Sequence, residues 1–317
     1  MDIVLVCHTE FGFVSGKTII GDKKATGGIS KGALNLVNLA EKYGAKITFC
    51  LCPETVNFFP KNLGHEIGLH IHPGWQELEY DNRKWFVGDK YLKSHCRQSV
   101  PSTALRDFSY NEQLEMIKKG KDCLENEFKA PIKVFAAGRW SVNNDTVKAL
   151  VQTGFTHDLS APSHSVSDHY DWSKLPRICL PYCPDENDYQ LSGLLPILIV
   201  PVSQTLFGGT ASLEGVTVYG LPWLRACFLE YWGAGLPLFH MSIHSPAMTS
   251  PYYISVMEEF LSFVAARKNI SFKFASEIKK YPIGQIENNL SPYLFALNKN
   301  LAITAARRLL GIKSIYH

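Results

Sequence analysis

Short apolar segments alternate with amphipathic segments along most of the chain. The apolar segments have the length and composition of buried strands and cover residues 3–7, 46–52, 132–136, 155–159, 196–203, 216–219, 236–244 and 271–274. Apolar positions at helical spacing predict helices between them, at residues 30–43, 54–59, 109–124, 147–153, 253–267 and 301–312. This alternation of strands and helices indicates a parallel sheet of the α/β class.

Several helix ends carry specific sequence signals. Ser109 and Glu112 have the spacing of a capping box, which predicts a helix N-terminus at this position. Ser30 is the expected N-cap of the first long helix, and Gly44 is its expected stop. Neither internal repeats nor low-complexity linkers divide the chain.

Composition places the chain among ordinary globular proteins. Its 317 residues, 46% hydrophobic and 19% charged, suffice for one large α/β barrel or two smaller domains. The 32 basic and 29 acidic residues give a net charge of +3, too balanced to indicate nucleic-acid binding. No apolar run approaches the roughly 18–20 residues of a membrane span, so we expect no transmembrane segment. No basic region precedes an apolar stretch at the N-terminus, so we expect a cytoplasmic protein.

The eight cysteines do not have the spacing of a structural zinc site. Cys50 and Cys52 are separated by one residue within a strand, and Cys179 and Cys183 flank Pro181. We therefore expect reduced, mostly buried thiols without a role in metal binding.

Candidate chemistry is concentrated at the ends of two predicted strands. His70 and His72 lie two residues apart where a strand runs into Pro73, so both side chains should face the same side of the sheet. His8 and Glu10 have the same spacing at the end of the first strand. Imidazole and carboxylate groups at neighbouring strand ends provide the three ligands of a catalytic metal site and one group to spare. Either pair alone is common by chance, so the prediction depends on their combination.

Further polar residues follow the ends of other predicted strands. Arg139, Asp158 and His244 each lie at or just after such an end. In an α/β barrel the carboxyl ends of all strands share one face, which carries the active site. We therefore expect these three side chains to lie near the two histidine-containing pairs.

On these residues the chain resembles the polysaccharide deacetylases, the NodB-homology proteins of carbohydrate esterase family 4. The most specific match is the segment GHEIGLHIHPGW at residues 64–75. Weaker matches are the phenylalanine and glycine at 135 and 138, the Pro-Tyr pair at 181–182, a strand that ends in Pro-Val at 201–202, and the late strand that ends at His244. The resemblance covers about residues 1–280.

The resemblance implies an irregular (β/α)7 barrel with a metal site, usually for zinc, formed by one acidic residue and two histidines. The metal-binding acid maps to Glu10 and the first histidine to His70. The second histidine of the family lies four residues after the first, where this chain has Gly74, so His72 is the nearest substitute. The general acid of the family, a histidine after the late strand, maps to His244.

Two family residues are missing, and the two losses are consistent with one change. The family has an aspartate as general base at the position of His8, and an arginine that tethers it near Ala136. His8 is then either the base, since its ordinary pKa of about 6.5 suits that task, or a fourth metal ligand. Arg139 would bind substrate charge or an oxyanion, and Asp158 would orient His244 or face the metal.

These observations predict a metal-dependent N-deacylase that acts on an acylamino sugar. The substrate would be a small molecule or a lipid-linked sugar used in bacterial surface polysaccharide assembly, such as O-antigen. One alternative is a degenerate sugar-binding protein on the same scaffold. Another is a hydrolase of a different amide, such as a formyl group.

Three further segments have candidate roles. Residues 12–28 form a long polar segment that would be a substrate-binding lid, and the aromatic residues of 73–108 would form either a sugar-binding wall or a packed surface. The chain should divide into a barrel at 1–285 and a C-terminal helical extension at 286–317. The basic amphipathic helix of this extension would pack on the barrel, contact a partner subunit or lie on an acidic membrane surface.

Overall fold

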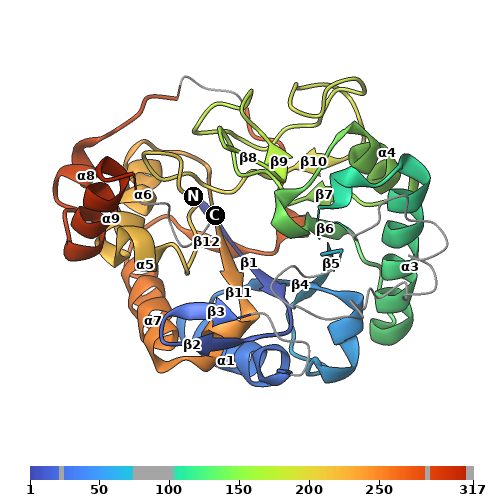
Figure 1. Ribbon diagram of the computed structural model, residues 1–317, viewed down its shortest axis with the longest axis horizontal. Helices are drawn as coiled ribbons and strands as arrows, with labels where there is room; N and C mark the ends of the chain where they lie inside the picture. Colours follow the sequence, from blue (N-terminus) through green and yellow to red (C-terminus); the bar gives the residue numbers. More distant parts are fainter. Residues whose placement is uncertain (21–24, 74–101, 103, 283–285, 312–317) are drawn as a thin grey trace.

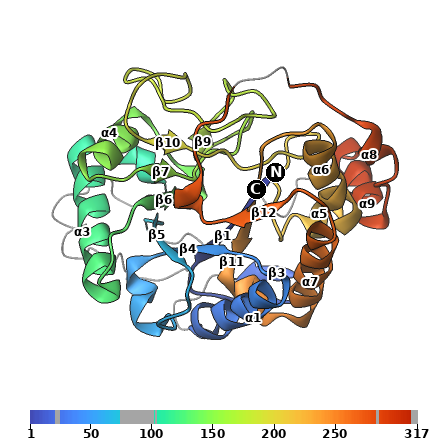
Figure 2. The same ribbon diagram turned by 180° about the vertical axis from the view of Figure 1, so that it is seen from behind.

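A curved parallel sheet is the centre of the molecule in the computed structural model, which describes residues 1–20, 25–73, 102, 104–282 and 286–311. The strands follow the order β10-β7-β6-β5-β4-β1-β11, and β12 pairs with β1. Figures 1 and 2 show helices surrounding this sheet. The predicted irregular (β/α)7 barrel is confirmed in the form of an open barrel.

The strands agree with the predicted segments at most positions. Those of the main sheet are β1 (Asp2–Thr9), β4 (Ile47–Leu51), β5 (Glu66–Ile71), β6 (Val134–Ala137), β7 (His157–Asp158), β10 (Leu198–Ile199), β11 (Leu238–His244) and β12 (Ser271–Lys273). Two small hairpins lie outside it, β2 (Phe13–Ser15) with β3 (Thr18–Ile20) and β8 (Val166–Ser167) with β9 (Tyr170–Asp171).

The longer helices also follow the predictions with one exception, because the apolar pattern predicts no helix at residues 221–233. They are α1 (Ala33–Tyr43), α3 (Tyr110–Phe128), α4 (Asn144–Gln152), α6 (Leu221–Gly233) and α7 (Pro251–Ala265). The capping box of Ser109 and Glu112 is present at the start of α3, and Gly44 ends α1 in the left-handed conformation, with φ 62°.

The two faces of the sheet bury different sets of side chains. In β1, Ile3, Leu5 and Cys7 face the helices and belong to the large outer core, whereas Val4 and Val6 face the barrel interior. The interior core is smaller and includes Cys50 of β4. Residues two apart share a face, so each strand delivers its next inward-facing side chain to the open mouth of the barrel.

Irregular chain bridges the gap between the outermost strands β10 and β11. The backbone N–H of Ser203 donates to the carbonyl of His240 at 3.0 Å, and the N–H of Ser242 donates to the carbonyl of Ala211 at 3.0 Å. The predicted strand at 196–203 is therefore shortened to β10. Pro196 and Pro201 explain this difference, because proline cannot donate to a sheet ladder.

Two local predictions are wrong. The segment Val216–Tyr219 is a short helix, α5, and not a strand, since a four-residue apolar run between Gly215 and Gly220 has no period that separates the two states. Ser30 does not cap α1, because a π-helical turn at Gly28–Gly32 precedes the helix and the Ser30 hydroxyl donates to the Thr26 carbonyl at 3.3 Å.

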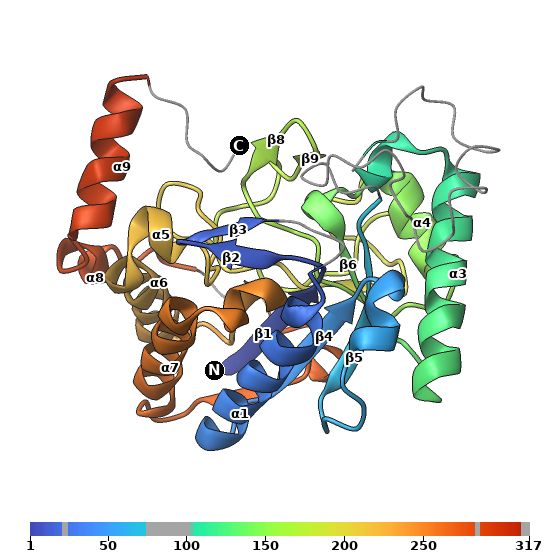
Figure 3. The same cartoon turned by 60° about the horizontal axis from the view of Figure 1, so that its bottom comes forward.

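The C-terminal extension packs on the barrel through α8 (Ser291–Leu294) and α9 (Lys299–Leu309). Tyr293 is buried and donates its hydroxyl to Glu230 of α6 at 2.9 Å. Figure 3 shows α9 beside α5, on the side of the sheet opposite α3. Within the described residues no helix combines the length and apolarity of a membrane span. The division into two domains stays a prediction.

The other two candidate segments are only partly described. Residues 12–28 contain the β2–β3 hairpin, and residues 21–24 lie outside the described residues. Residues 74–101 and 103, which include the predicted aromatic wall, also lie outside them. Both proposed roles stay predictions.

Candidate functional site

The strand register arranges the inward-facing side chains at the barrel mouth in levels. His8 of β1 is aligned with His244 of β11 and with Cys50 of β4. Cys50 is aligned with Gly68 of β5, and His70 with Ala136 of β6. Two residues further along, Glu10, Cys52 and His70 therefore share the next level. Parallel pairing alone brings together these three side chains from distant parts of the sequence.

Glu10, Cys52 and His70 form a buried group of potential metal donors. One ligand atom from each lies within 4.8 Å of the others. Oε1 of Glu10 is 2.8 Å from Nε2 of His70, and these side chains are 7% and 1% exposed. Burial of this kind is costly for a carboxylate unless a partner or a cation stabilises it.

The ring of His70 is fixed by a hydrogen bond on its other side. Its Nδ1 lies 2.8 Å from the carbonyl oxygen of Ala136, so Nδ1 carries a proton and donates it. Its Nε2 faces the Glu10 carboxylate, an arrangement that requires either a proton or a cation between the two atoms. A backbone carbonyl that orients the non-ligating nitrogen is typical of metal-binding histidines.

Glu10 is ionised in this environment. Burial acts to raise its pKa, but the hydrogen bond to His70 and electrostatic interactions with the imidazoles of His72 and His70 lower the pKa well below its ordinary value. The group therefore provides a full negative charge inside the barrel mouth.

His8 lies at the centre of a cluster of rings. Its centroid is 4.8 Å from that of His70, 5.1 Å from that of His244 and 5.1 Å from that of Trp140. Burial, followed by the charges of His70 and His244, lowers the pKa of His8 well below its ordinary value. The ring is thus neutral, and its buried Nε2 has no hydrogen-bond partner within the described residues.

His72 lies two residues beyond His70 along the chain and outside the group of three donors. It follows β5, its ring centroid is 5.9 Å from that of His70, and burial lowers its pKa to about 3. A Cβ atom at Gly138 would lie 2.6 Å from Cγ of His72, so the ring packs directly against the glycine backbone. The ring is not among the donors that lie within 4.8 Å of one another.

Glu214 holds His244 from an irregular part of the chain. The backbone N–H of His244 donates to Oε1 of Glu214 at 2.8 Å, and Nδ1 of the ring is 3.4 Å from Oε2. The carboxylate is close enough to stabilise the positive charge that the ring carries when protonated.

Arg139 and Asp158 have other contacts. Nη1 of Arg139 is 3.3 Å from Nε2 of His169. Asp158 is fully buried and accepts hydrogen bonds from the backbone N–H and the hydroxyl of Ser160. Burial raises the pKa of Asp158 to about 7. The contact with His244 predicted for Asp158 is made by Glu214, and catalytic roles for Arg139 and Asp158 stay predictions.

A strained turn places Trp140 against His8. Arg139 and Trp140 both have positive φ angles, 53° and 54°, in the short helix Gly138–Trp140 that follows β6. Two successive non-glycine residues in this region cost of order 1–3 kcal/mol each. The carbonyl of Trp140 accepts a hydrogen bond from the fully buried Trp172 at 3.1 Å, which helps to hold the turn.

Sequence reasoning missed Cys52, Glu214 and Trp140. Cys52 lacks the CxxC spacing of a structural zinc site, but its position two residues after Cys50 places it on the same face as the donors. Trp140 directly follows Arg139 and was accessible to the same argument about strand ends. Glu214 lies in an irregular segment, and no sequence signal pointed to it.

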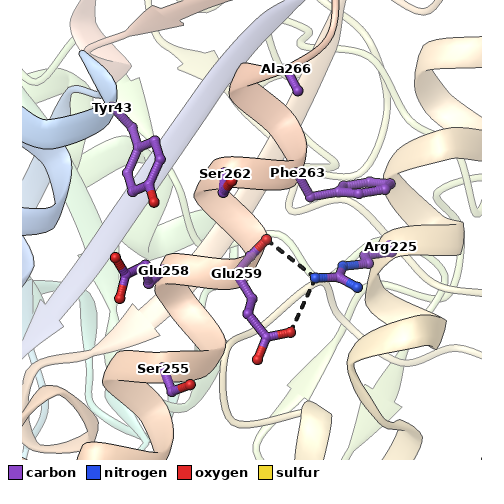
Figure 4. Close-up of a pocket in the computed structure, with 8 residues that line it drawn as sticks. All are labelled: Tyr43, Arg225, Ser255, Glu258, Glu259, Ser262, Phe263 and Ala266. Carbon is purple, nitrogen blue, oxygen red and sulfur yellow. Dashed lines mark hydrogen bonds and ion pairs between the residues drawn. The ribbon is translucent and has the colours of Figure 1, made fainter.

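The described surface includes a cavity next to the candidate site and a groove away from it. The cavity of about 870 Å³ is lined by Trp140 and Glu214, and it therefore adjoins His8 and His244. The groove, between α1, α6 and α7, is shown in Figure 4 and includes the ion pair of Arg225 and Glu259 at 3.2 Å. No residue of the candidate site lines this groove, so it is not part of the same site.

Comparison with known structures identifies the fold. A protein from Mycobacterium smegmatis described as a polysaccharide deacetylase is 15% identical, with a TM-score of 0.55 over 89% of this chain and 94% of that chain. A Pseudomonas aeruginosa protein described in the same way is 14% identical, with a TM-score of 0.54 over 87% and 88%. Puue allantoinase is 13% identical, with a TM-score of 0.55 over 87% and 88%. No protein-family model and no curated protein matches the sequence. The chain therefore has the polysaccharide deacetylase fold.

Proposed function

We propose that the protein is a metal-dependent N-deacylase of an acylamino sugar. The observation that carries the proposal is the buried pair of Glu10 and His70 at the barrel mouth, with Nδ1 of His70 fixed by the carbonyl of Ala136. The fold supports it, because two of the similar structures are described as polysaccharide deacetylases. The third is an allantoinase, so the fold does not choose the substrate.

The donor set fits a divalent transition metal. Glu10, His70 and His72 would hold the ion, and the thiol of Cys52 is a further donor in reach of the first two. Carboxylate, imidazole and thiol donors together favour Zn²⁺. Such an ion, when bound, activates water and polarises the acyl carbonyl.

The remaining side chains move protons. The buried ring of His8 contacts His70, and its Nε2 has no hydrogen-bond partner within the described residues, so this atom is placed to accept a proton during attack on the amide. His244, in contact with Glu214, can donate a proton to the leaving amine. The two rings lie 5.1 Å apart, which allows one substrate amide to contact both. Arg139 is proposed to bind substrate charge or an oxyanion, and Asp158 to support this face of the barrel.

We further propose that the enzyme acts in the cytoplasm on a small or lipid-linked sugar of bacterial surface polysaccharide synthesis, such as O-antigen. Residues 1–285 would form the catalytic barrel and residues 286–317 a helical extension. These statements rest on the resemblance of the sequence to carbohydrate deacetylases and on its composition.

Metal content and turnover test the proposal together. Elemental analysis of wild-type protein should find one transition metal per chain, and His70→Ala and His70→Gln should both lose the metal and the release of acetate from acetylated amino sugars. His65→Ala is the matched control, because this histidine precedes the same strand at its other end. Turnover that survives in folded His70→Gln protein would refute the proposal.

The position of Cys52 favours one alternative, a sugar-binding protein without hydrolytic activity. If Glu10, Cys52, His70 and His72 all bound the ion, four protein ligands would leave no open position for water, as in structural zinc sites. Cys52→Ala separates the two functions. In a deacylase the substitution should preserve turnover. In a closed four-ligand site it should remove one ligand and create an open position. N-Formyl sugars in the same assay distinguish a deformylase from a deacetylase.

A further inference from the structure

The cavity beside the candidate site extends from the barrel mouth to the C-terminal helix. Trp140 and Glu214 line one part, and Tyr219, Arg307 and Arg308 line another. Its volume of about 870 Å³ is in the upper part of the range of about 300–1,000 Å³ found for small-molecule sites. The cavity therefore has room for a substrate that is longer than one sugar ring.

The cavity is electrically asymmetric. Glu214, its only acidic residue among those described, is held by His244 at the end next to the site. Lys17, Arg307 and Arg308 are exposed cationic residues of the same cavity, and no ion pair joins them to a carboxylate in the described part of the chain. The ammonium of Lys17 lies over the ring of Tyr252, 4.3 Å from its centroid, a contact that leaves its positive charge unneutralised. Cationic groups that no carboxylate neutralises attract an anionic ligand.

Hydrogen bonds fix the helix that carries the two arginines. Side chains of α9 donate to carbonyls of α5: Nδ2 of Asn300 to Val216 at 3.0 Å, and Oγ1 of Thr304 to Val218 at 2.7 Å. Arg308 itself donates to the hydroxyl of Tyr219 at 3.3 Å. The cationic end of the cavity is thus held in place relative to the barrel.

We propose that Arg307 and Arg308, with Lys17, bind a phosphate group of the substrate, which would be a phosphate ester of an acylamino sugar. The sugar part rests on the proposed function, whereas the phosphate subsite rests on the cavity alone. Arginine pairs phosphate oxygens with two donors at once, which gives both affinity and orientation. Trp140 and Tyr219 add aromatic side chains to the lining of the cavity.

The same phosphate chemistry has two possible carriers, a soluble nucleotide or a membrane lipid. The exposed side chains of Leu309 and Leu310, 88% and 73% accessible, follow the arginines directly and would suit a lipid carrier. The experiment therefore includes a soluble probe and a vesicle.

Calorimetric titration of the full-length protein with pyrophosphate and with UDP-N-acetylglucosamine tests the subsite. Arg307→Gln/Arg308→Gln should weaken binding of both probes at least about tenfold, the loss expected for one charge-assisted hydrogen bond. Lys279→Gln/Lys280→Gln removes the same charge from exposed positions outside the cavity and should leave both affinities unchanged. The wild-type affinities should fall with added salt.

Several outcomes decide the proposal. Equal affinity of wild-type and doubly substituted protein for pyrophosphate, or no binding by wild-type protein at low ionic strength, overturns it. His70→Ala protein should still bind pyrophosphate, which shows that the anion is not held at the candidate metal centre. Because this titration needs no turnover, failure of the deacylase proposal would not affect the result.

Sedimentation with phosphatidylglycerol vesicles identifies the carrier. If the double substitution reduces both pyrophosphate binding and vesicle binding, the subsite serves a lipid carrier. If wild-type protein binds pyrophosphate but no vesicles, it serves a nucleotide. A double substitution that reduces vesicle binding alone would make α9 a membrane contact and overturn the phosphate subsite.

Discussion

The pair of Glu10 and His70 should dominate the energetics of the barrel mouth. Glu10 is 5% and His70 1% exposed, and their facing atoms are 2.8 Å apart. Removing one partner of a buried pair leaves the other charge uncompensated, which costs about 3–5 kcal/mol. His70→Ala should therefore lower the free energy of unfolding by about this amount, a large part of the roughly 5–15 kcal/mol of an ordinary domain.

A double-mutant cycle separates the pair from the rest of the site. Glu10→Gln combined with His70→Ala removes the charge and its partner together, so the double variant should be more stable than the sum of the single effects predicts. Urea unfolding at pH 7, followed by tryptophan fluorescence, measures each free energy.

The same assay with zinc reports ligation. At a free zinc concentration of 100 times Kd, binding should add about 2.7 kcal/mol to the wild-type protein, and a chelator should remove it. None of the three variants should gain this increment. A loss below about 1 kcal/mol in His70→Ala, with zinc stabilisation retained, would refute the assignment of the pair as both a buried interaction and a ligand set.

Two other substitutions probe the surroundings. The pKa of Asp158 rises from 3.8 to about 7 on folding, so the folded chain binds the extra proton between these values and stability falls as pH rises through this window. Asp158→Asn keeps an acceptor for Ser160. Its free energy of unfolding in urea, relative to that of the wild type, should rise by up to about 4 kcal/mol between pH 4 and pH 7. A difference between the two proteins that does not change with pH would contradict the pKa shift. Gly138→Ala places a methyl group 2.6 Å from the His72 ring, so thermal or urea unfolding should show a loss of about 1–3 kcal/mol, whereas Gly27→Ala, with no atom within 4 Å, should show none.

Much of the fold was accessible from sequence, because strand and helix periods differ clearly in long elements. The helices α1, α3, α4 and α7 and the strands β1, β4, β5 and β11 lie where the apolar pattern predicts them. The failures are short elements. Four apolar residues, as in α5, have no measurable period, and tertiary packing decides their conformation.

The candidate site was accessible where it depends on strand ends and inaccessible where it depends on loops. His8, Glu10, His70 and His244 come together because neighbouring strands run parallel in one register. Glu214 reaches His244 from an irregular segment, and the position of such a segment is set by long-range packing that no local pattern encodes. His72 illustrates a limit of the i, i+2 rule. Two residues that face the same side of a sheet still lie at different positions along the strand, and His72 is not among the donors grouped around Glu10 and His70.

The levels of the barrel mouth have a consequence for engineering. The side chains of Glu10, Cys52 and His70 are placed by the parity of their positions along β1, β4 and β5, so inserting one residue within one of these strands would turn the following side chains from the interior toward the helices. Insertions before the N-terminal end of a strand, for example between α1 and β4, would leave this parity intact. A library that grafts new chemistry onto this scaffold can therefore vary in length the helices and the turns that follow them. It must change the strands by substitution alone.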